Sequence, residues 1–135
     1  MTELATNDKI EEVEKAMLEL PQLECPLQHH FCNGVYLRVI TMPKGAKIIG
    51  HEHKTEHFNV ILSGKAKVIC GDDVSIIEAP HLFVSKPGVR KILEIIEDMS
   101  WMTVHPTDKK EFSDGLESDL INKSASFKSK LEVCK

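Results

Sequence analysis

Between residues 33 and 105, short segments rich in β-branched and aromatic residues alternate with turn signals that contain glycine or proline. The turn signals are Asn33-Gly34 and the runs PKG, GDD and KPG at 43–45, 71–73 and 86–88. Between them we expect strands at 33–42, 57–64, 65–70, 74–79, 81–85, 90–96 and 100–104. Short strands at such regular spacing are typical of a β-sandwich or β-barrel, which predicts an all-β domain.

The two ends of the chain differ from this β-rich region. Residues 7–20 predict a short amphipathic helix, with Asn7 or Asp8 as its N-cap, because apolar side chains recur at helical spacing until Pro21. The polar C-terminal stretch has a short helical pattern near 113–122. We therefore divide the chain into a helical extension, a β-barrel domain and a polar, partly helical tail, at 1–24, 25–106 and 107–135.

Charge and cysteine content limit the classes of function. The 135 residues carry a net charge of −4, which argues against a sequence-independent nucleic-acid binder. No apolar run is long enough to span a membrane, and the polar N-terminus does not resemble a signal peptide. The four cysteines form no C-x-x-C pair, so we expect reduced thiols and a cytoplasmic protein.

The run HEHKTEH at 51–57 holds three of the seven histidines of the chain. In an extended segment, His51, His53 and His57 have the same parity and point to one face. Three converging imidazoles predict a site for a divalent transition-metal ion, for which zinc, iron, manganese and nickel are the candidates. The alternative is an exposed polar loop that happens to be rich in histidine. Glu56 would face the interior only if the strand bulges.

The glycines that flank this run complete a spacing pattern. With Gly45 and Gly64 it reads G-x5-H-x-H-x3-H-x6-G, which resembles the first cupin motif, G-x5-H-x-H-x3,4-E-x6-G. His57 stands where cupins usually have glutamate. The second cupin motif is weaker, since Lys91 stands where its histidine ligand is expected. The resemblance covers the β-rich region and implies a single cupin jelly-roll barrel around a central pocket, in a family whose small members commonly form homodimers.

Lys91 changes what such a pocket would bind. A lysine ammonium has no lone pair for a metal ion, but it attracts anions. Arg38 lies mid-strand between apolar neighbours, and Tyr36 shares its parity. If Arg38, Lys91 and Tyr36 face the pocket, we expect a small carboxylate or phosphate as the ligand. His30 and His105 could reach the pocket mouth, although a surface or capping position is the simpler interpretation of each.

The sequence leaves two functions open and assigns no catalytic residue. The first is a metal-binding cupin that holds a divalent ion through His51, His53 and His57 and binds a small anionic molecule, with or without catalysis. The second is a non-enzymatic accessory or interaction protein. It follows from the runs HEHKTEH, SKPGVRK and WMTVHPT, which resemble those of small cupin-like proteins of tailed phages and prophages. That resemblance implies ligand sequestration or antagonism of a host protein.

Overall fold

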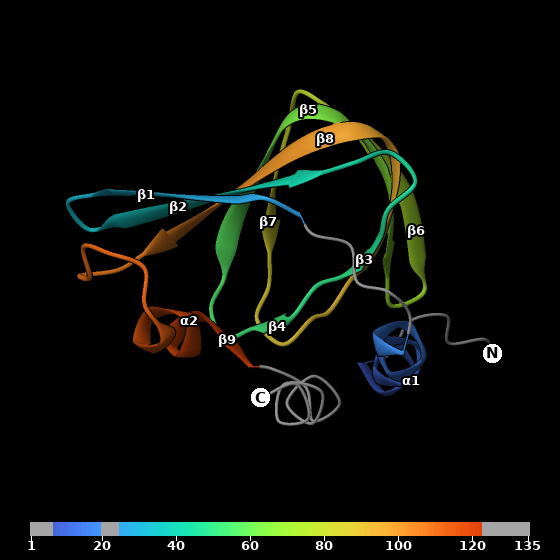
Figure 1. Ribbon diagram of the computed structural model, residues 1–135, viewed down its shortest axis with the longest axis horizontal. Helices are drawn as coiled ribbons and strands as arrows, with labels where there is room; N and C mark the ends of the chain where they lie inside the picture. The colour runs from blue at the N-terminus through green and yellow to red at the C-terminus, as the bar shows by residue number, and fades with distance from the viewer. Residues whose placement is uncertain (1–6, 20–24, 123–135) are drawn as a thin grey trace.

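A computed structural model describes residues 7–19 and 25–122. The predicted β-rich domain flanked by two short helices is confirmed (Figure 1). The elements are α1 (Asn7–Leu18), β1 (Leu27–Cys32), β2 (Val35–Met42), β3 (Lys47–Ile49), β4 (Glu52–His53), β5 (His57–Cys70), β6 (Asp73–Glu78), β7 (His81–Ser85), β8 (Ile92–Pro106), α2 (Asp114–Leu120) and β9 (Ile121–Asn122).

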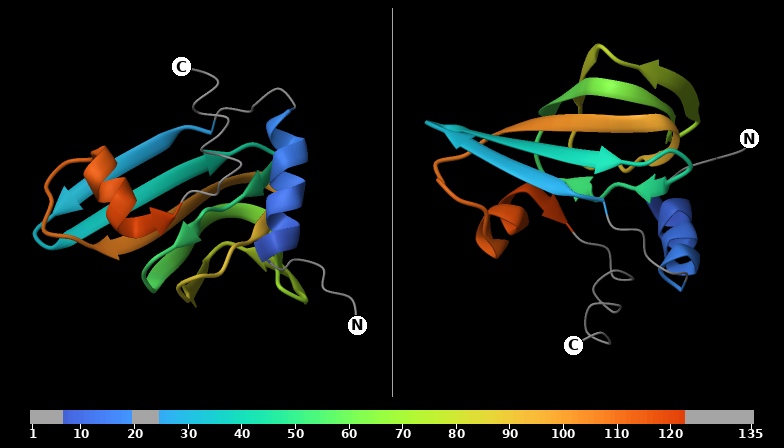
Figure 2. Two further views of the ribbon diagram at one scale, coloured as in Figure 1. Left: turned by 90° about the horizontal axis from the view of Figure 1, so that it is seen from below. Right: turned by 45° about the horizontal axis from the view of Figure 1, so that its top comes forward.

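The strands form one curved antiparallel sheet that wraps around the interior (Figure 2). Its order is β1-β2-β8-β5-β6, with β3 paired to β8 and β7 paired to β5, while β4 and β9 form a separate two-stranded ladder. Within the described ranges β1 and β6 do not pair with each other, so the sheet is not closed into a complete barrel. The helices α1 and α2 lie on the same side of the sheet, near its opposite ends (Figure 1).

Two long strands, β5 and β8, replace the four shorter ones that the sequence predicts at 57–64, 65–70, 90–96 and 100–104. The break predicted between the strands 57–64 and 65–70 is wrong: at Ser63-Gly64 the β5–β8 ladder is irregular and its register shifts. Such a bulge inserts a residue without ending the strand. It also changes the inward parity of β5. Before the bulge the buried residues have odd numbers, and after it they have even numbers: His57, Asn59, Ile61, Ala66 and Val68.

Gly64 makes this bulge possible, and its replacement by alanine is our first prediction. Its φ is +94°, and an added Cβ would overlap Met99 of β8. We expect Gly64→Ala to lower the free energy of unfolding by about 2–3 kcal/mol, because backbone strain and overlap add together. Gly45→Ala is the matched control, since Gly45 has φ +86° but open space around its Cβ position. Urea denaturation that gives equal losses for both variants would contradict the close approach to Met99.

The concave side of the sheet carries the main core. It is built mostly by β2, β5 and β8, from Met42, Ala46, Ile61, Ala66, Val68, Leu93, Ile95, Met99 and Trp101. The edge strand β1 was not predicted, because its sequence LQHHFC is polar and most of its side chains are exposed. His30 therefore lies in a strand, where it contacts Gln28 in solvent, rather than before the first strand. Three cysteines of the described ranges carry free thiols in this structure: Cys25, Cys32 and Cys70.

Both predicted helices are confirmed, with different ends. The helix predicted at 7–20 ends at Leu18, and the side chains of its predicted caps, Asn7 and Asp8, lie outside the described part. The C-terminal helix predicted near 113–122 is α2. Neither helix in the described ranges is long and apolar enough to cross a membrane.

An ion pair between two buried side chains fixes α1 to the sheet. Arg90 Nη2 lies 2.6 Å from Glu14 Oε2, and the two side chains are only 5% and 7% exposed. Arg90 Nη1 lies 3.4 Å from Glu14 Oε1, and Arg90 Nε donates to the Gly50 carbonyl at 2.8 Å. Each charge is therefore neutralised where water does not reach it, and removal of either partner would take the opposite charge away from the other buried side chain.

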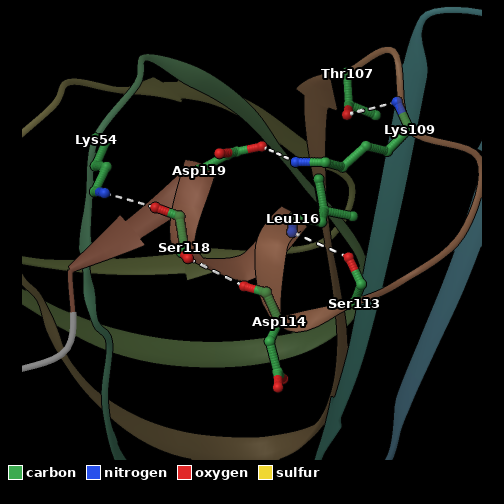
Figure 3. Close-up of polar contacts among 8 residues, drawn as sticks. All are labelled: Lys54, Thr107, Lys109, Ser113, Asp114, Leu116, Ser118 and Asp119. Carbon is green, nitrogen blue, oxygen red and sulfur yellow. Dashed lines mark hydrogen bonds and ion pairs between the residues drawn. The ribbon is translucent and has the colours of Figure 1, made fainter.

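The tail after β8 packs against the sheet as far as it is described (Figure 3). Ser113 caps α2 by accepting a hydrogen bond from the Leu116 amide at 3.2 Å. Lys54 joins the tail to the chain after β4, because its Nζ donates to the Ser118 carbonyl at 2.6 Å. The strand β9 then pairs with β4, so that Ile121 lies opposite His53. The tail thus positions the strand that carries His53. The rest of the predicted tail, from residue 123, lies outside the described ranges.

Candidate functional site

A cavity of about 770 Å³ lies on the concave side of the sheet. Its walls come from α1, the sheet strands and α2, and its volume falls in the range of small-molecule sites. The structure brings all six predicted site residues to this cavity: Tyr36, Arg38, His51, His53, His57 and Lys91.

The cavity wall brings together imidazoles of the predicted set and one that the spacing does not predict. The ring centroids of His53 and His57 are 4.3 Å apart. His105 is the third member, with its centroid 4.8 Å from that of His57 and 5.8 Å from that of His53. His51 lines the same cavity from the residue before β4. The simpler interpretation of His105, a surface or capping residue, is wrong, because its side chain is 1% exposed.

The path of the chain explains this grouping. HEHKTEH is not one extended strand: β4 ends at His53, the chain bends at 54–55, and β5 starts at His57. His57 faces inward at 5% exposure, whereas Glu56 is exposed, as the parity argument predicts. His105 has the parity of Trp101 on β8. That signal was present in the sequence, because Trp101 is a predicted strand residue with a core role.

The cluster is held in the neutral state. Burial, with repulsion from His57, His105 and two nearby cations, lowers the pKa of His53 to about 3. Burial also lowers the pKa of His105 to about 4, and it lowers the pKa of His57. A buried imidazole without a nearby carboxylate stays uncharged because its protonated form would lose its hydration. At neutral pH these rings therefore keep a lone pair.

The hydrogen bonds of two of these rings determine which nitrogen carries that lone pair. His57 Nδ1 donates to the Thr55 carbonyl at 3.3 Å, which leaves Nε2 unprotonated. His105 Nε2 lies 2.8 Å from Thr103 Oγ1, while its buried Nδ1 has no hydrogen-bond partner among the described residues. Neutral imidazole nitrogens of this kind are metal ligands.

The donor chemistry thus fits a divalent ion, although the placement of the side chains does not yet do so. In the described part of the chain, no three His, Cys, Asp or Glu side chains are arranged so that they could hold a metal ion. At least one ring would have to turn about its side-chain bonds to bring three lone pairs to one point. The metal ligation predicted for His51, His53 and His57 therefore stays a prediction.

A chain of hydrogen bonds leads from the core to Lys91. Trp101 Nε1 donates to Asn59 Oδ1 at 2.9 Å, and Asn59 Nδ2 donates to Ser85 Oγ at 2.8 Å. Ser85 Oγ in turn contacts Lys91 Nζ, which lies 5.5 Å from the centroid of the Phe83 ring. Burial lowers the pKa of Lys91. Sequence reasoning selected Lys91 but missed Asn59 and Ser85, whose roles depend on pairing between β5 and β7.

Arg38 and Tyr36 occupy the wall beside the histidines. The guanidinium of Arg38 is close enough to contribute to the low pKa of both His53 and His105. No carboxylate of the described residues forms an ion pair with Arg38. Tyr36 is 1% exposed, stacks on His105 at 5.8 Å, and shares a 2.6 Å hydrogen bond between its hydroxyl and His29 Nδ1. Tyr36 therefore presents its ring to the cavity, since its hydroxyl is already engaged.

Comparison with known proteins identifies the fold. No protein-family model and no curated protein sequence matches the chain. Among solved structures, it is similar to a cupin superfamily protein of Desulfitobacterium hafniense, with TM-score 0.54, 10% identity and coverage of 70% of this chain and 87% of that one. It is also similar to an RmlC-like cupin of Methanocaldococcus jannaschii, with TM-score 0.53, 11% identity and coverage of 80% and 91%.

A third similar structure is the cupin domain of Cnp3 from Schizosaccharomyces pombe, with TM-score 0.54, 21% identity and coverage of 67% of each chain. At these identities the likeness shows the fold alone. The chain has the cupin fold, as its first motif predicts, in the form of an open jelly-roll sheet with a helix near each end. The similarity to phage and prophage proteins stays a prediction.

Proposed function

We propose that this protein binds a divalent transition-metal ion and a small anionic molecule side by side in the cavity of its cupin fold. One observation carries the proposal: three clustered imidazoles and two cationic side chains without carboxylate partners line a single cavity. Neutral imidazoles are donors for a metal ion, and unpaired cations are donors for an anion. The combination is typical of a ligand site, because even half-buried cations without a carboxylate partner lose part of their hydration.

His53 and His57 would hold the metal ion, together with His105 or His51. Zinc, iron, manganese and nickel are the candidate ions, and imidazole nitrogens suit zinc, iron and nickel best. When bound, the ion would supply a Lewis acid for a ligand oxygen. The described residues themselves keep the imidazoles neutral by burial and place His57 Nε2 as a donor through the Nδ1 hydrogen bond to Thr55.

Arg38 and Lys91 would bind the anion. Both line the cavity, and no ion pair among the described residues includes either of them. A carboxylate fits the planar guanidinium of Arg38, which can donate two parallel hydrogen bonds to it. The mostly apolar surroundings of the cavity strengthen these interactions, because they exclude competing water.

Metal content tests this proposal directly. We expect elemental mass spectrometry of protein made without a histidine tag to find about one metal ion per chain, as in a three-histidine site. A double variant, His53→Ala with His57→Ala, should lose it. The control His30→Ala removes an exposed histidine of β1 and should keep the metal. Separate His51→Ala and His105→Ala variants identify the third ligand. Wild-type protein without metal, after growth with all four ions, would contradict metal binding.

A metal-free binding protein is the second candidate. It is favoured by the arrangement of the rings, which holds no ion as the described side chains stand, and by Lys91 at the place of the fourth ligand. In that case the anion would occupy the cavity alone, and the protein would act by sequestering it or by contacting a partner protein. Homodimer formation and a host-protein partner are further parts of this second proposal.

A further inference from the structure

The amino group of Lys91 is half-buried and has no carboxylate partner among the described residues, and the Cys70 thiol is the one titratable group whose charge raises its pKa, against the larger effect of burial. Its Nζ contacts Ser85 Oγ and lies near the face of the Phe83 ring, and the ion pairs among the described residues do not include it. The preceding residue shows the contrast, because the buried guanidinium of Arg90 is neutralised by Glu14. An enclosed ammonium without such a partner is disfavoured relative to the uncharged amine, and burial lowers the pKa of Lys91 accordingly.

The hydrogen bonds of Ser85 hold the amino group of Lys91 in place. The Trp101 indole can only donate, so Asn59 Oδ1 must accept and Asn59 Nδ2 must donate to Ser85 Oγ. Ser85 is buried, and its hydroxyl oxygen accepts this hydrogen bond. Among the described residues, the other side-chain atom in contact with Ser85 Oγ is Lys91 Nζ. Lys91 Nζ donates to Ser85 Oγ, and an uncharged amine keeps hydrogens for this bond while it gains a lone pair, so the contact persists when Lys91 loses a proton.

We infer that Lys91 forms a covalent imine with a small aldehyde or ketone that carries a carboxylate. This deepens the proposed function, because it rests on the cavity as the site of a small anion. The lone pair of Nζ attacks the carbonyl carbon and forms a C–N bond. The carbonyl oxygen then leaves as water, with the two hydrogens of the amine, and a C=N bond remains. No oxidant or reductant is consumed. Desolvated lysines of this kind are known to be nucleophiles toward carbonyl compounds.

Arg38, beside the histidines, favours a carbonyl compound that carries a carboxylate. Arg38 lines the same cavity and has no carboxylate partner in the described ranges. A carboxylate held by Arg38 would keep the carbonyl group of a short 2-oxo acid inside the cavity that Lys91 also lines. Such positioning raises the effective concentration of the carbonyl at the amine. A simple aldehyde lacks this anchor.

Reductive trapping tests the inference on the full-length wild-type protein. Glyoxylate with cyanoborohydride at pH 7 reduces any imine to a stable carboxymethyl-lysine, and peptide mass spectrometry locates it. We expect Lys91 to be labelled several-fold faster than Lys47, because burial lowers the pKa of Lys91 and so leaves more of its amine uncharged. Lys47 is the internal control, since it is exposed and borders the same cavity. Acetaldehyde should show a smaller preference for Lys91, and Arg38→Met should reduce the preference with glyoxylate only.

Equal labelling of Lys91 and Lys47 would overturn the inference. A titration with glyoxylate alone, without the reductant, measures binding through the fluorescence of Trp101, which lines the cavity. This measurement distinguishes a failure of the imine from a failure of the proposed function. Binding without preferential trapping overturns the imine and keeps the anion site. If glyoxylate is neither bound nor trapped, both the imine and the anion site are overturned. Because the site is mapped in the wild-type chain, the result does not depend on whether a Lys91 variant folds.

Discussion

Replacement of Glu14 by glutamine lowers the free energy of unfolding by about 3–5 kcal/mol, the cost of breaking a buried ion pair by removing the charge of one partner. The substitution keeps the size of the side chain and removes only the charge opposite Arg90. Arg90 is 4% exposed, and its own backbone contact, to the Gly50 carbonyl, cannot neutralise the guanidinium. Urea denaturation at pH 7 measures the loss. The effect should be close to that of Arg90→Met, which leaves the carboxylate of Glu14 buried instead.

The matched control removes both charges. A double variant, Glu14→Leu with Arg90→Met, should recover most of the loss, because a buried ion pair contributes little net stability over apolar side chains of similar size. A double variant that loses the sum of the two single effects would show that the two residues act separately. A loss under 1 kcal/mol in Glu14→Gln would show that water reaches the pair.

The ion pair between Glu14 and Arg90 also affects how far solvent can enter the cavity. Glu14, Met17 and Leu18 of α1 line the cavity, so a loosened helix exposes its contents. Trp101 is the only tryptophan in the chain, is 5% exposed, and also lines the cavity. We therefore expect iodide to quench the fluorescence of Glu14→Gln more strongly than that of the wild type at a pH and temperature where both are folded.

Local patterns in the sequence were sufficient for the fold. The strand predicted at 81–85 coincides with β7, and the turns at 33–34, 43–45 and 86–88 are present. These signals are local, since glycine and proline act through their own backbone. The spacing from Gly45 to Gly64 resembles the first cupin motif, and it was this resemblance that implied the cupin fold.

Features that depend on pairing between distant strands could not be predicted. Ser63-Gly64 has the composition of a turn, and only the neighbouring strand β8 makes it a bulge. His105 belongs to the histidine cluster because β8 pairs with β5 and places Val104 opposite Phe58. The bend at 54–55 replaced the single extended segment on which the parity of His51 depended. All six predicted residues nevertheless line the cavity, because each lies on the concave side of the sheet.

Metal-free protein should lose stability steeply as the pH falls from about 6.5 toward about 4. In the unfolded chain, histidine takes up a proton near its ordinary pKa of 6.5. In the folded chain, burial lowers the pKa of His105 to about 4 and that of His53 to about 3. Between these values the unfolded state binds more protons, so acid favours unfolding. Each such histidine costs about 1.4 kcal/mol per pH unit within this window, and neither contributes to the pH dependence above about pH 7.

A comparison of two variants isolates this effect from the protonation of carboxylates, which also destabilises proteins at low pH. His105→Gln removes a ring that is 1% exposed, and His30→Gln removes an exposed one. Urea midpoints at pH 7, 6 and 5 should converge between the wild type and His105→Gln as the pH falls, because the variant has one fewer buried imidazole to protonate. The curve of His30→Gln should run parallel to that of the wild type. If His105→Gln also ran parallel, the folded cluster would have to take up protons as readily as the unfolded chain, and its rings would then be hydrated rather than enclosed. The cluster would in that case be charged in mild acid, which is the condition under which a histidine site releases a metal ion.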